Sequence, residues 1–172
     1  MIRDELYHLI KIARPSAFVH KEQNVTRYRN PSSTHHQTDL RCDIMVTDNL
    51  EQYIIDVSVI DPTTICAINK GSHSKPFIAA GIREKEKRQD YGRYLSSDML
   101  EKFVPFVLES TGRFGHSASS FIDKICKLDK LDLAYDDAIR SARWRFLQSV
   151  SNILVITSAQ VARLSRYGEA AA

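Results

Sequence analysis

The stretch that most constrains the fold is residues 40–61, where apolar side chains recur at every second position in two runs. Residues 40–47 and 54–61 alternate in this way and are rich in β-branched side chains, which predicts two strands. The polar residues 48–51 between them predict a short turn. If this four-residue loop closes a hairpin, Thr47 lies opposite Gln52, and the same register places Asp43 opposite Asp56.

Asp43 and Asp56 are unusual residues for the middle of an apolar hairpin. Directly opposed side chains on antiparallel strands have Cβ atoms about 4.5–5.5 Å apart, and like charges in such a pair are destabilising. A shared divalent cation would explain the two carboxylates, because hard oxygen ligands suit Mg²⁺. The alternatives are that one or both carboxylates point to solvent, or that a one-residue slip in register places them on opposite faces.

The composition is that of an ordinary globular domain. The chain has 172 residues, which suits a single domain over residues 1–172 with its own core. Its three cysteines, an odd number without metal-ligand spacing, predict reduced thiols in an intracellular compartment. No apolar run approaches the ~20 residues of a membrane span, and the N-terminus lacks the hydrophobic core of a signal peptide. We therefore expect no membrane association.

The remaining elements follow from periodicity. Helices are predicted at residues 3–13, 77–91 and 117–128, and a C-terminal amphipathic helix at about 134–166. Apolar positions recur at steps of three and four along this last helix and predict a buried stripe: Ile139, Ala142, Phe146, Val150, Ile153, Thr157, Val161 and Leu164. A third strand is predicted at residues 103–109, where Pro105 favours an edge position or the beginning of the strand. Residues 14–39 are predicted to be irregular apart from a short strand near residues 18–19. Together these elements predict an α/β fold with a mixed sheet flanked by helices, with its core at about residues 18–128.

A lysine-rich helix follows the two acidic strands, with Lys85 and Lys87 near its middle. Carboxylates that hold Mg²⁺ allow the ion to polarise a phosphate and to lower the pKa of its bound water. A nearby ammonium group stabilises the charge that develops on the phosphate. Lys85 and Lys87 point in nearly opposite directions on a helix, so only one of them can serve. This combination is what hydrolysis of a phosphodiester requires.

The order of these motifs resembles the PD-(D/E)XK nuclease superfamily, and more closely the restriction-like endonuclease domain of site-specific non-LTR retrotransposons. The matching segments are residues 41–44 (RCDI), 55–59 (IDVSV) and 87–91 (KRQDY). The resemblance covers about residues 20–110, and more loosely residues 144–166. It implies a restriction-endonuclease-like fold and Mg²⁺-dependent cleavage of DNA, with Mn²⁺ as an alternative cofactor.

The resemblance also implies roles for particular residues. Asp43 and Asp56 would be metal ligands, and Glu22 would complete the metal shell. Lys87 would be the catalytic lysine, which in this group has moved from the strand to the following helix, with Lys85 as the substitute candidate. Glu109, at the end of the third strand, is better explained as a structural residue.

The chain departs from the family pattern at three positions. Cys42 replaces the proline that usually precedes the first aspartate, and Ser58 stands where the standard superfamily lysine would be. Asp90 replaces the second lysine of the pair that precedes the tyrosine. Activity would therefore depend on the lysine of the helix.

Several functions remain open from the sequence. The net charge is only +3, too small to indicate nucleic-acid binding by itself, but cations cluster on the predicted helix. We expect these cations to contact DNA phosphates without reading bases: Arg83, Lys85, Lys87, Arg88 and Arg93, with Lys75 from the preceding loop. The alternative is a catalytically inactive nuclease-fold module that binds nucleic acid or a protein partner. The C-terminal helix could mediate such a contact or a homo-oligomer, and an origin in a eukaryotic retroelement would imply a nuclear location.

Overall fold

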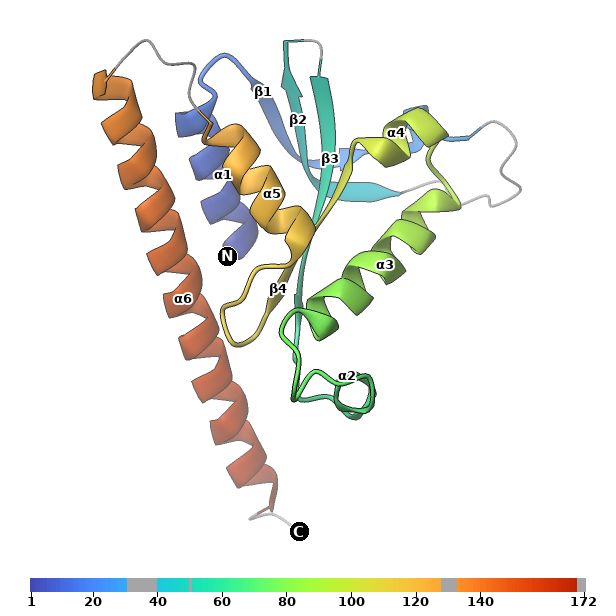
Figure 1. Cartoon of the computed structure of the whole chain (residues 1–172), viewed down its shortest axis with the longest axis vertical. Helices are drawn as coiled ribbons and strands as arrows, with labels where there is room; N and C mark the ends of the chain where they lie inside the picture. The colour runs from blue at the N-terminus through green and yellow to red at the C-terminus, as the bar shows by residue number, and fades with distance from the viewer. Residues whose placement is uncertain (31–39, 50, 128–132, 170–172) are drawn as a thin grey trace.

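The computed structural model of the chain describes residues 1–30, 40–49, 51–127 and 133–169, including their side chains except those of residues 133–135 and 160–169. Within these residues four strands form one sheet: β1 (Phe18–Asn24), β2 (Arg41–Asp48), β3 (Glu51–Ile60) and β4 (Phe103–Glu109). The helices are α1 (Ile2–Ala13), α2 (Ile65–Asn69), α3 (Ile78–Gly92), α4 (Ser97–Glu101), α5 (His116–Ile125) and α6 (Leu133–Glu169), and a short 3-10 helix, η1 (Thr26–Tyr28), follows β1. The predicted α/β class, with a mixed sheet flanked by helices and a long C-terminal helix, is confirmed (Figure 1).

The strand order is β1-β2-β3-β4. β1 and β2 pair antiparallel, as do β2 and β3, whereas β3 and β4 are parallel and are connected through α2, α3 and α4. Thr47 pairs with Gln52 as predicted, but Asp48 also pairs with Glu51, so the strands extend further towards the turn than the expected four-residue loop allows. The register of the hairpin was nevertheless readable from the sequence.

Strand β4 has the predicted bounds and lies at one edge of the described sheet. The backbone nitrogen of Glu109 and the carbonyl oxygen of Val107 are bonded to Arg113 and Gly115, on the side away from β3. By the alternation of a strand, the nitrogen of Pro105 points to the same side. The N–H that proline lacks therefore costs no ladder hydrogen bond, which confirms the edge position predicted from Pro105.

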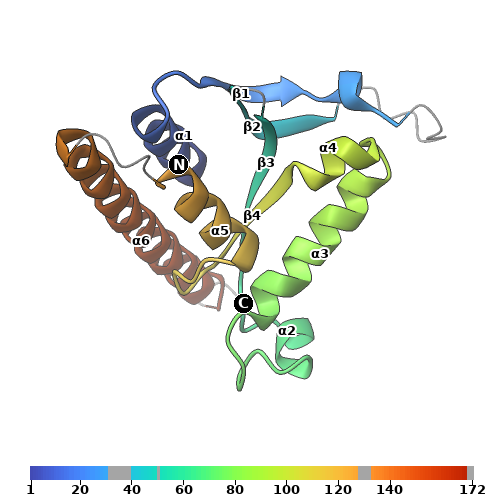
Figure 2. The same cartoon turned by 45° about the horizontal axis from the view of Figure 1, so that its top comes forward.

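Helices cover both faces of the sheet, and each face has its own apolar core (Figure 2). Ile44 and Ile55 belong to the larger core, which the sheet forms with α1, α5 and α6. Met45 and Ile54 belong to the smaller core, which includes side chains of α3 and α4. Burial on both faces makes the predicted one-sided alternation of residues 40–47 only partly right, since Met45 is as deeply buried as Ile44.

The other elements agree with the sequence where periodicity is strong. Helices α1, α3 and α5 lie within three residues of their predicted bounds. Helices α2 and α4 were not predicted, because five residues are too few to show a helical period. Strand β1 is longer than the predicted strand near residues 18–19, and its mostly exposed side chains give no alternating signal. Residues 31–39, predicted to be irregular, lie outside the described residues.

Helix α6 packs along α1 through its predicted apolar stripe. Ile139, Ala142, Phe146 and Val150 are buried as predicted, but Thr157 is exposed and Leu154 is buried instead. Val161 and Leu164, also predicted in the stripe, lie outside the described side chains. Trp144 and Val155 are exposed on the face of α6 opposite the buried stripe, and Leu147 and Ile156 are exposed on its two sides. A partner or a second copy on the outward side of α6 stays a prediction. None of the helices in the described part of the chain combines the length and apolarity that crossing a membrane requires.

The packing of α6 can be tested with two aromatic residues two positions apart. Phe146 is 2% exposed and contacts Phe106 and Phe114 edge-on or at a tilt, whereas Trp144 is 63% exposed. We expect Phe146→Ala to lower the free energy of unfolding by about 3–5 kcal/mol through the cavity that it leaves. Trp144→Ala should change it by no more than about 0.5 kcal/mol. Urea unfolding measures both, and equal effects would show that α6 is not part of the core.

Candidate active site

Strands β2 and β3 separate at Asp43. Their ladder ends at the pair Ile44–Ile55, whereas β3 continues beside β4 to Ile60; Figure 1 shows the start of β2 leaving β3. Just beyond the last pair, the backbone N–H of Val57 donates to Oδ2 of Asp43 at 2.7 Å. A side-chain carboxylate thus occupies the place of a strand carbonyl. We call the opening between β2 and β3 beyond the pair Ile44–Ile55 the strand split. The Asp43 carboxylate lies in it, next to the peptide that joins Asp56 to Val57.

The neighbouring strand β1 is irregular at the same level. Glu22 has a φ of 55°, between the regular pairs Lys21–Ile44 and Gln23–Cys42. The pairs on either side keep the same register, so no residue is inserted and the irregularity is confined to the position between them. Cys42 and Ile44 consequently belong to opposite cores although residues two apart on a strand normally share a face.

Asp56 is 9% exposed and is held by two side chains of α3. The Lys87 Nζ lies 2.7 Å from Asp56 Oδ2. The Tyr91 hydroxyl donates to Asp56 Oδ1 at 2.9 Å and also lies 3.1 Å from the carbonyl oxygen of Arg41, while its ring stacks on Phe103. Tyr91 was not predicted as a site residue, but the sequence signal was present, because it lies one helical turn after Lys87.

The electrostatics of Asp43 reflect its position between strands. Burial raises the pKa of the Asp43 carboxyl above its usual range, and the negative charge of Asp56 adds to this effect. The hydrogen bond from Val57 and the positive charges of Arg3 and Lys87 oppose it. Burial also raises the pKa of the adjacent Cys42 thiol to about 11, so this thiol is protonated near neutral pH. The Asp43 carboxylate is thus costly to keep charged, which favours a cation beside it.

Glu22 does not join the acidic pair as predicted. Its carboxylate instead accepts a hydrogen bond from Arg3 Nη1, and Arg3 is brought to the sheet by α1. Within the described ranges, no three His, Cys, Asp or Glu side chains are grouped so that they could hold a metal ion. The three-carboxylate shell implied by the resemblance is therefore not formed, because the guanidinium of Arg3 binds the third carboxylate.

Lys85 and the other predicted DNA-binding cations do not gather around Lys87. Lys85 and Arg88 are exposed and line a shallow depression with Gly81 and Glu84, on the outer flank of α3. Arg83 pairs with Glu86. Arg93 at the end of α3 and Lys75 in the preceding loop are exposed. Of the two lysines considered for catalysis, the structure brings only Lys87 to the acidic pair.

Two other carboxylates cap helices and could not be recognised from local sequence. Glu84 Oε1 accepts a hydrogen bond from the backbone N–H of Ser117 in the first turn of α5, at 2.9 Å. Glu109, 2% exposed, accepts a long hydrogen bond from Ala80 N in the first turn of α3 and pairs with Arg113. Acidic groups at helix N-termini are stabilising, so these contacts give Glu109 the structural role expected for it.

The residues at the strand split fit a single divalent cation. Asp56 Oδ2 is shielded from solvent and has the Lys87 ammonium nearby, but no hydrogen bond of acceptable direction. Mg²⁺ is commonly bound by one or two carboxylates, with water and substrate phosphate completing its octahedron. Asp43 and Asp56 would then be the protein ligands of such an ion, without Glu22.

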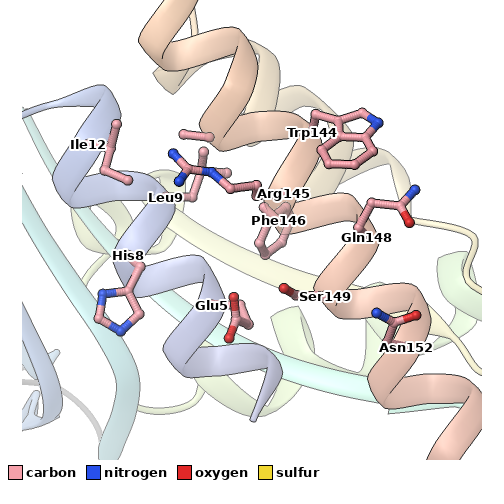
Figure 3. Close-up of a pocket in the computed structure, with 11 residues that line it drawn as sticks. Glu5, His8, Leu9, Ile12, Trp144, Arg145, Phe146, Gln148, Ser149 and Asn152 are labelled. Carbon is pink, nitrogen blue, oxygen red and sulfur yellow. The ribbon is translucent and has the colours of Figure 1, made fainter.

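A groove between α1 and α6 lies away from the strand split (Figure 3). It is lined by Glu5, His8, Arg145 and Asn152 among others, and Trp144 points outward at its rim. It contains none of the predicted site residues. The strand split is thus the place where the structure concentrates acidic and cationic groups that sequence analysis singled out.

Comparison with known proteins adds no further guide to function: the chain matches no family model, no curated protein and no solved structure. Function must therefore be argued from the geometry of the strand split.

The role of Lys87 at the strand split can be tested against Lys85. We expect Lys87→Met to lower the free energy of unfolding at neutral pH by about 3 kcal/mol, because it leaves the buried Asp56 carboxylate without its ammonium partner. Lys85→Met, on the outer flank of the same helix, should change it by no more than about 0.5 kcal/mol. Chemical denaturation measures both, and a neutral Lys87→Met would contradict the pairing.

Proposed function

We propose that this chain is a Mg²⁺-dependent endonuclease that hydrolyses phosphodiester bonds of DNA at the strand split. One observation carries the proposal: Asp43, Asp56 and Lys87, from three different elements, meet at the point where β2 and β3 separate. A pair of carboxylates with an adjacent ammonium group is the set of groups that metal-assisted hydrolysis of a phosphodiester needs.

Each residue has a defined task in this proposal. Asp43 and Asp56 hold the cation, for which Mn²⁺ could substitute. When bound, Mg²⁺ would polarise the scissile phosphate and lower the pKa of a coordinated water. Val57 N–H orients Asp43, and the hydroxyl of Tyr91 orients Asp56. Such supporting hydrogen bonds tune metal ligands strongly.

Lys87 has two successive partners in the proposal. Its ammonium group neutralises Asp56 in the free protein. With substrate present, a donor at this position stabilises negative charge that develops on the phosphate oxygens. Lys87 would take this task in place of a strand lysine, since Ser58 occupies the position on β3 where PD-(D/E)XK nucleases carry theirs.

The DNA contacts would be electrostatic. Arg83, Lys85, Arg88, Arg93 and Lys75 are placed on α3 and the preceding loop, from which they could reach phosphates on either side of the strand split. Lys85 thereby keeps a DNA-binding role while losing the catalytic one. The resemblance to retroelement nucleases supports a nicking activity and, for a eukaryotic element, a nuclear location.

A second function is a catalytically inactive nuclease-fold module. Two observations favour it: Glu22 is bound by Arg3 rather than free for a metal, and Lys87 already pairs with Asp56. Such a module would bind nucleic acid through its cations, or a protein partner or second copy through the outward face of α6. It would neither bind Mg²⁺ at the strand split nor cut DNA.

A plasmid-nicking assay with Mg²⁺ separates the two functions. We expect the purified chain to relax supercoiled DNA, and EDTA, Asp43→Asn or Asp56→Asn to abolish detectable nicking. Asp90→Asn is the matched control, because Asp90 is an exposed carboxylate of α3 and should retain the activity.

Retained cooperative unfolding of the Asp43→Asn and Asp56→Asn proteins excludes a trivial loss of fold. Nicking that persists in both of these variants would refute the site, and a wild-type protein without nicking would favour the inactive module.

A further inference from the structure

Among the described residues, three buried side-chain atoms lack a hydrogen-bond partner: Arg3 Nε, Asp56 Oδ2 and Ser58 Oγ. Buried polar atoms almost always have a partner, so an unsatisfied one often marks the place of a water, an ion or a ligand. Arg3 and Ser58 line the same groove as Asp43, and Ser58 lies two residues from Asp56 on β3. All three unsatisfied atoms therefore belong to residues at or next to the strand split.

The groove that Arg3, Ser58 and Asp43 share is lined mostly by apolar side chains. Its volume is about 400 Å³, within the roughly 300–1,000 Å³ of small-molecule sites. Ile2 of α1, Val59 of β3 and Ile153 of α6 supply apolar surface, and Thr157 of α6 adds a hydroxyl. The groove opens because β2 no longer covers β3 beyond Ile55 in the described sheet.

We propose that this groove holds one unpaired nucleotide of the DNA strand next to the scissile phosphate, with Arg3 and Ser58 donating to a phosphate oxygen and the apolar walls contacting the sugar and base. The identity of the ligand rests on the proposed nuclease function. The groove itself is continuous with the strand split through Asp43, which lines both.

Arg3 is suited to a phosphate by its chemistry and by its neighbours. A guanidinium presents several donors in a planar fork that matches phosphate oxygens. Glu22 engages Nη1 and Asp4 lies 3.9 Å from Nε, beyond hydrogen-bond distance, so donor capacity remains. The Glu22 carboxylate thus holds Arg3, which lines the groove together with Asp43.

The apolar part of the groove selects an unpaired nucleotide. A base in a duplex is stacked inside the helix, so a duplex offers a protein its phosphates and groove edges rather than a free sugar and base. An unstacked nucleotide exposes both faces of its base, which proteins commonly hold against apolar or aromatic side chains. We therefore expect single-stranded DNA, or a duplex with an unpaired nucleotide, to be favoured over an intact duplex.

The test measures binding of fluorescent DNA by anisotropy in the presence of Ca²⁺, a hard cation that takes the same oxygen ligands. A 20-nucleotide single strand and the matching duplex are compared, and gel analysis of the same samples records any cleavage. Arg3→Gln removes the proposed phosphate donor, and Lys11→Gln, an exposed cation of the same helix, controls for the lost charge. Thr157→Trp fills the groove from α6, and Ser158→Trp adds the same bulk at the next exposed position outside it.

We expect Arg3→Gln and Thr157→Trp each to weaken single-strand binding by roughly tenfold or more, as loss of a charge-assisted hydrogen bond or of the binding space does. Duplex affinity should change less than about threefold, and both controls should bind like the wild type. Because Thr157 is exposed, its variant remains informative even if Arg3→Gln unfolds the protein.

Two results would overturn the inference: single-strand affinities equal to those of the controls, or equal losses for single strand and duplex. Neither depends on hydrolysis. A wild type that cuts no DNA in the Mg²⁺ nicking assay, while Arg3→Gln and Thr157→Trp lose single-strand affinity, would refute the nuclease and leave the groove. A wild type that nicks DNA while both variants bind normally would refute the groove and leave the nuclease.

Discussion

The hydrogen bond from Val57 N–H to the Asp43 carboxylate is the contact on which the candidate site depends. In a continuous antiparallel pair that N–H would donate to a backbone carbonyl of β2, and the two strands would stay together. A side-chain acceptor at this position satisfies the N–H while the strands separate. The result is an opening in the sheet that carries one carboxylate in the gap and a second on the adjoining residue.

Helices on both faces of the sheet supply the positive charges that such an opening requires. Helix α3 brings Lys87 and Tyr91 to Asp56, and α1 brings Arg3 towards Asp43 and Glu22. Each helix is anchored by its own core, so each cation is fixed independently of the other. This arrangement holds two like charges close together in a partly buried place, where a carboxylate pair without counter-ions would be expected to bind a proton.

The fold and part of the site could be predicted from local sequence patterns. The pairing of Thr47 with Gln52 followed from counting a short loop. Lys87 was preferred to Lys85 on the resemblance, and the orientation of the helix on the sheet brings Lys87 to Asp56. The ion pair between Arg3 and Glu22 joins two elements that share no local pattern, and the left-handed backbone of Glu22 has no sequence signal, since Glu rarely adopts it.

The helical period already placed the cations of α3 on different sides of the helix. Which of these sides faces the sheet is decided by tertiary packing. The caps that Glu84 and Glu109 provide likewise depend on long-range contacts.

The most direct test of the central claim is a calorimetric titration of the wild-type chain with Mg²⁺, repeated with Mn²⁺. A cation site at the strand split predicts saturable binding near one ion per chain, which Asp43→Asn and Asp56→Asn should abolish. Glu22→Gln should retain this binding, because the Glu22 carboxylate is bound by Arg3. Absence of binding, or binding that survives both aspartate substitutions, would contradict a metal site between β2 and β3.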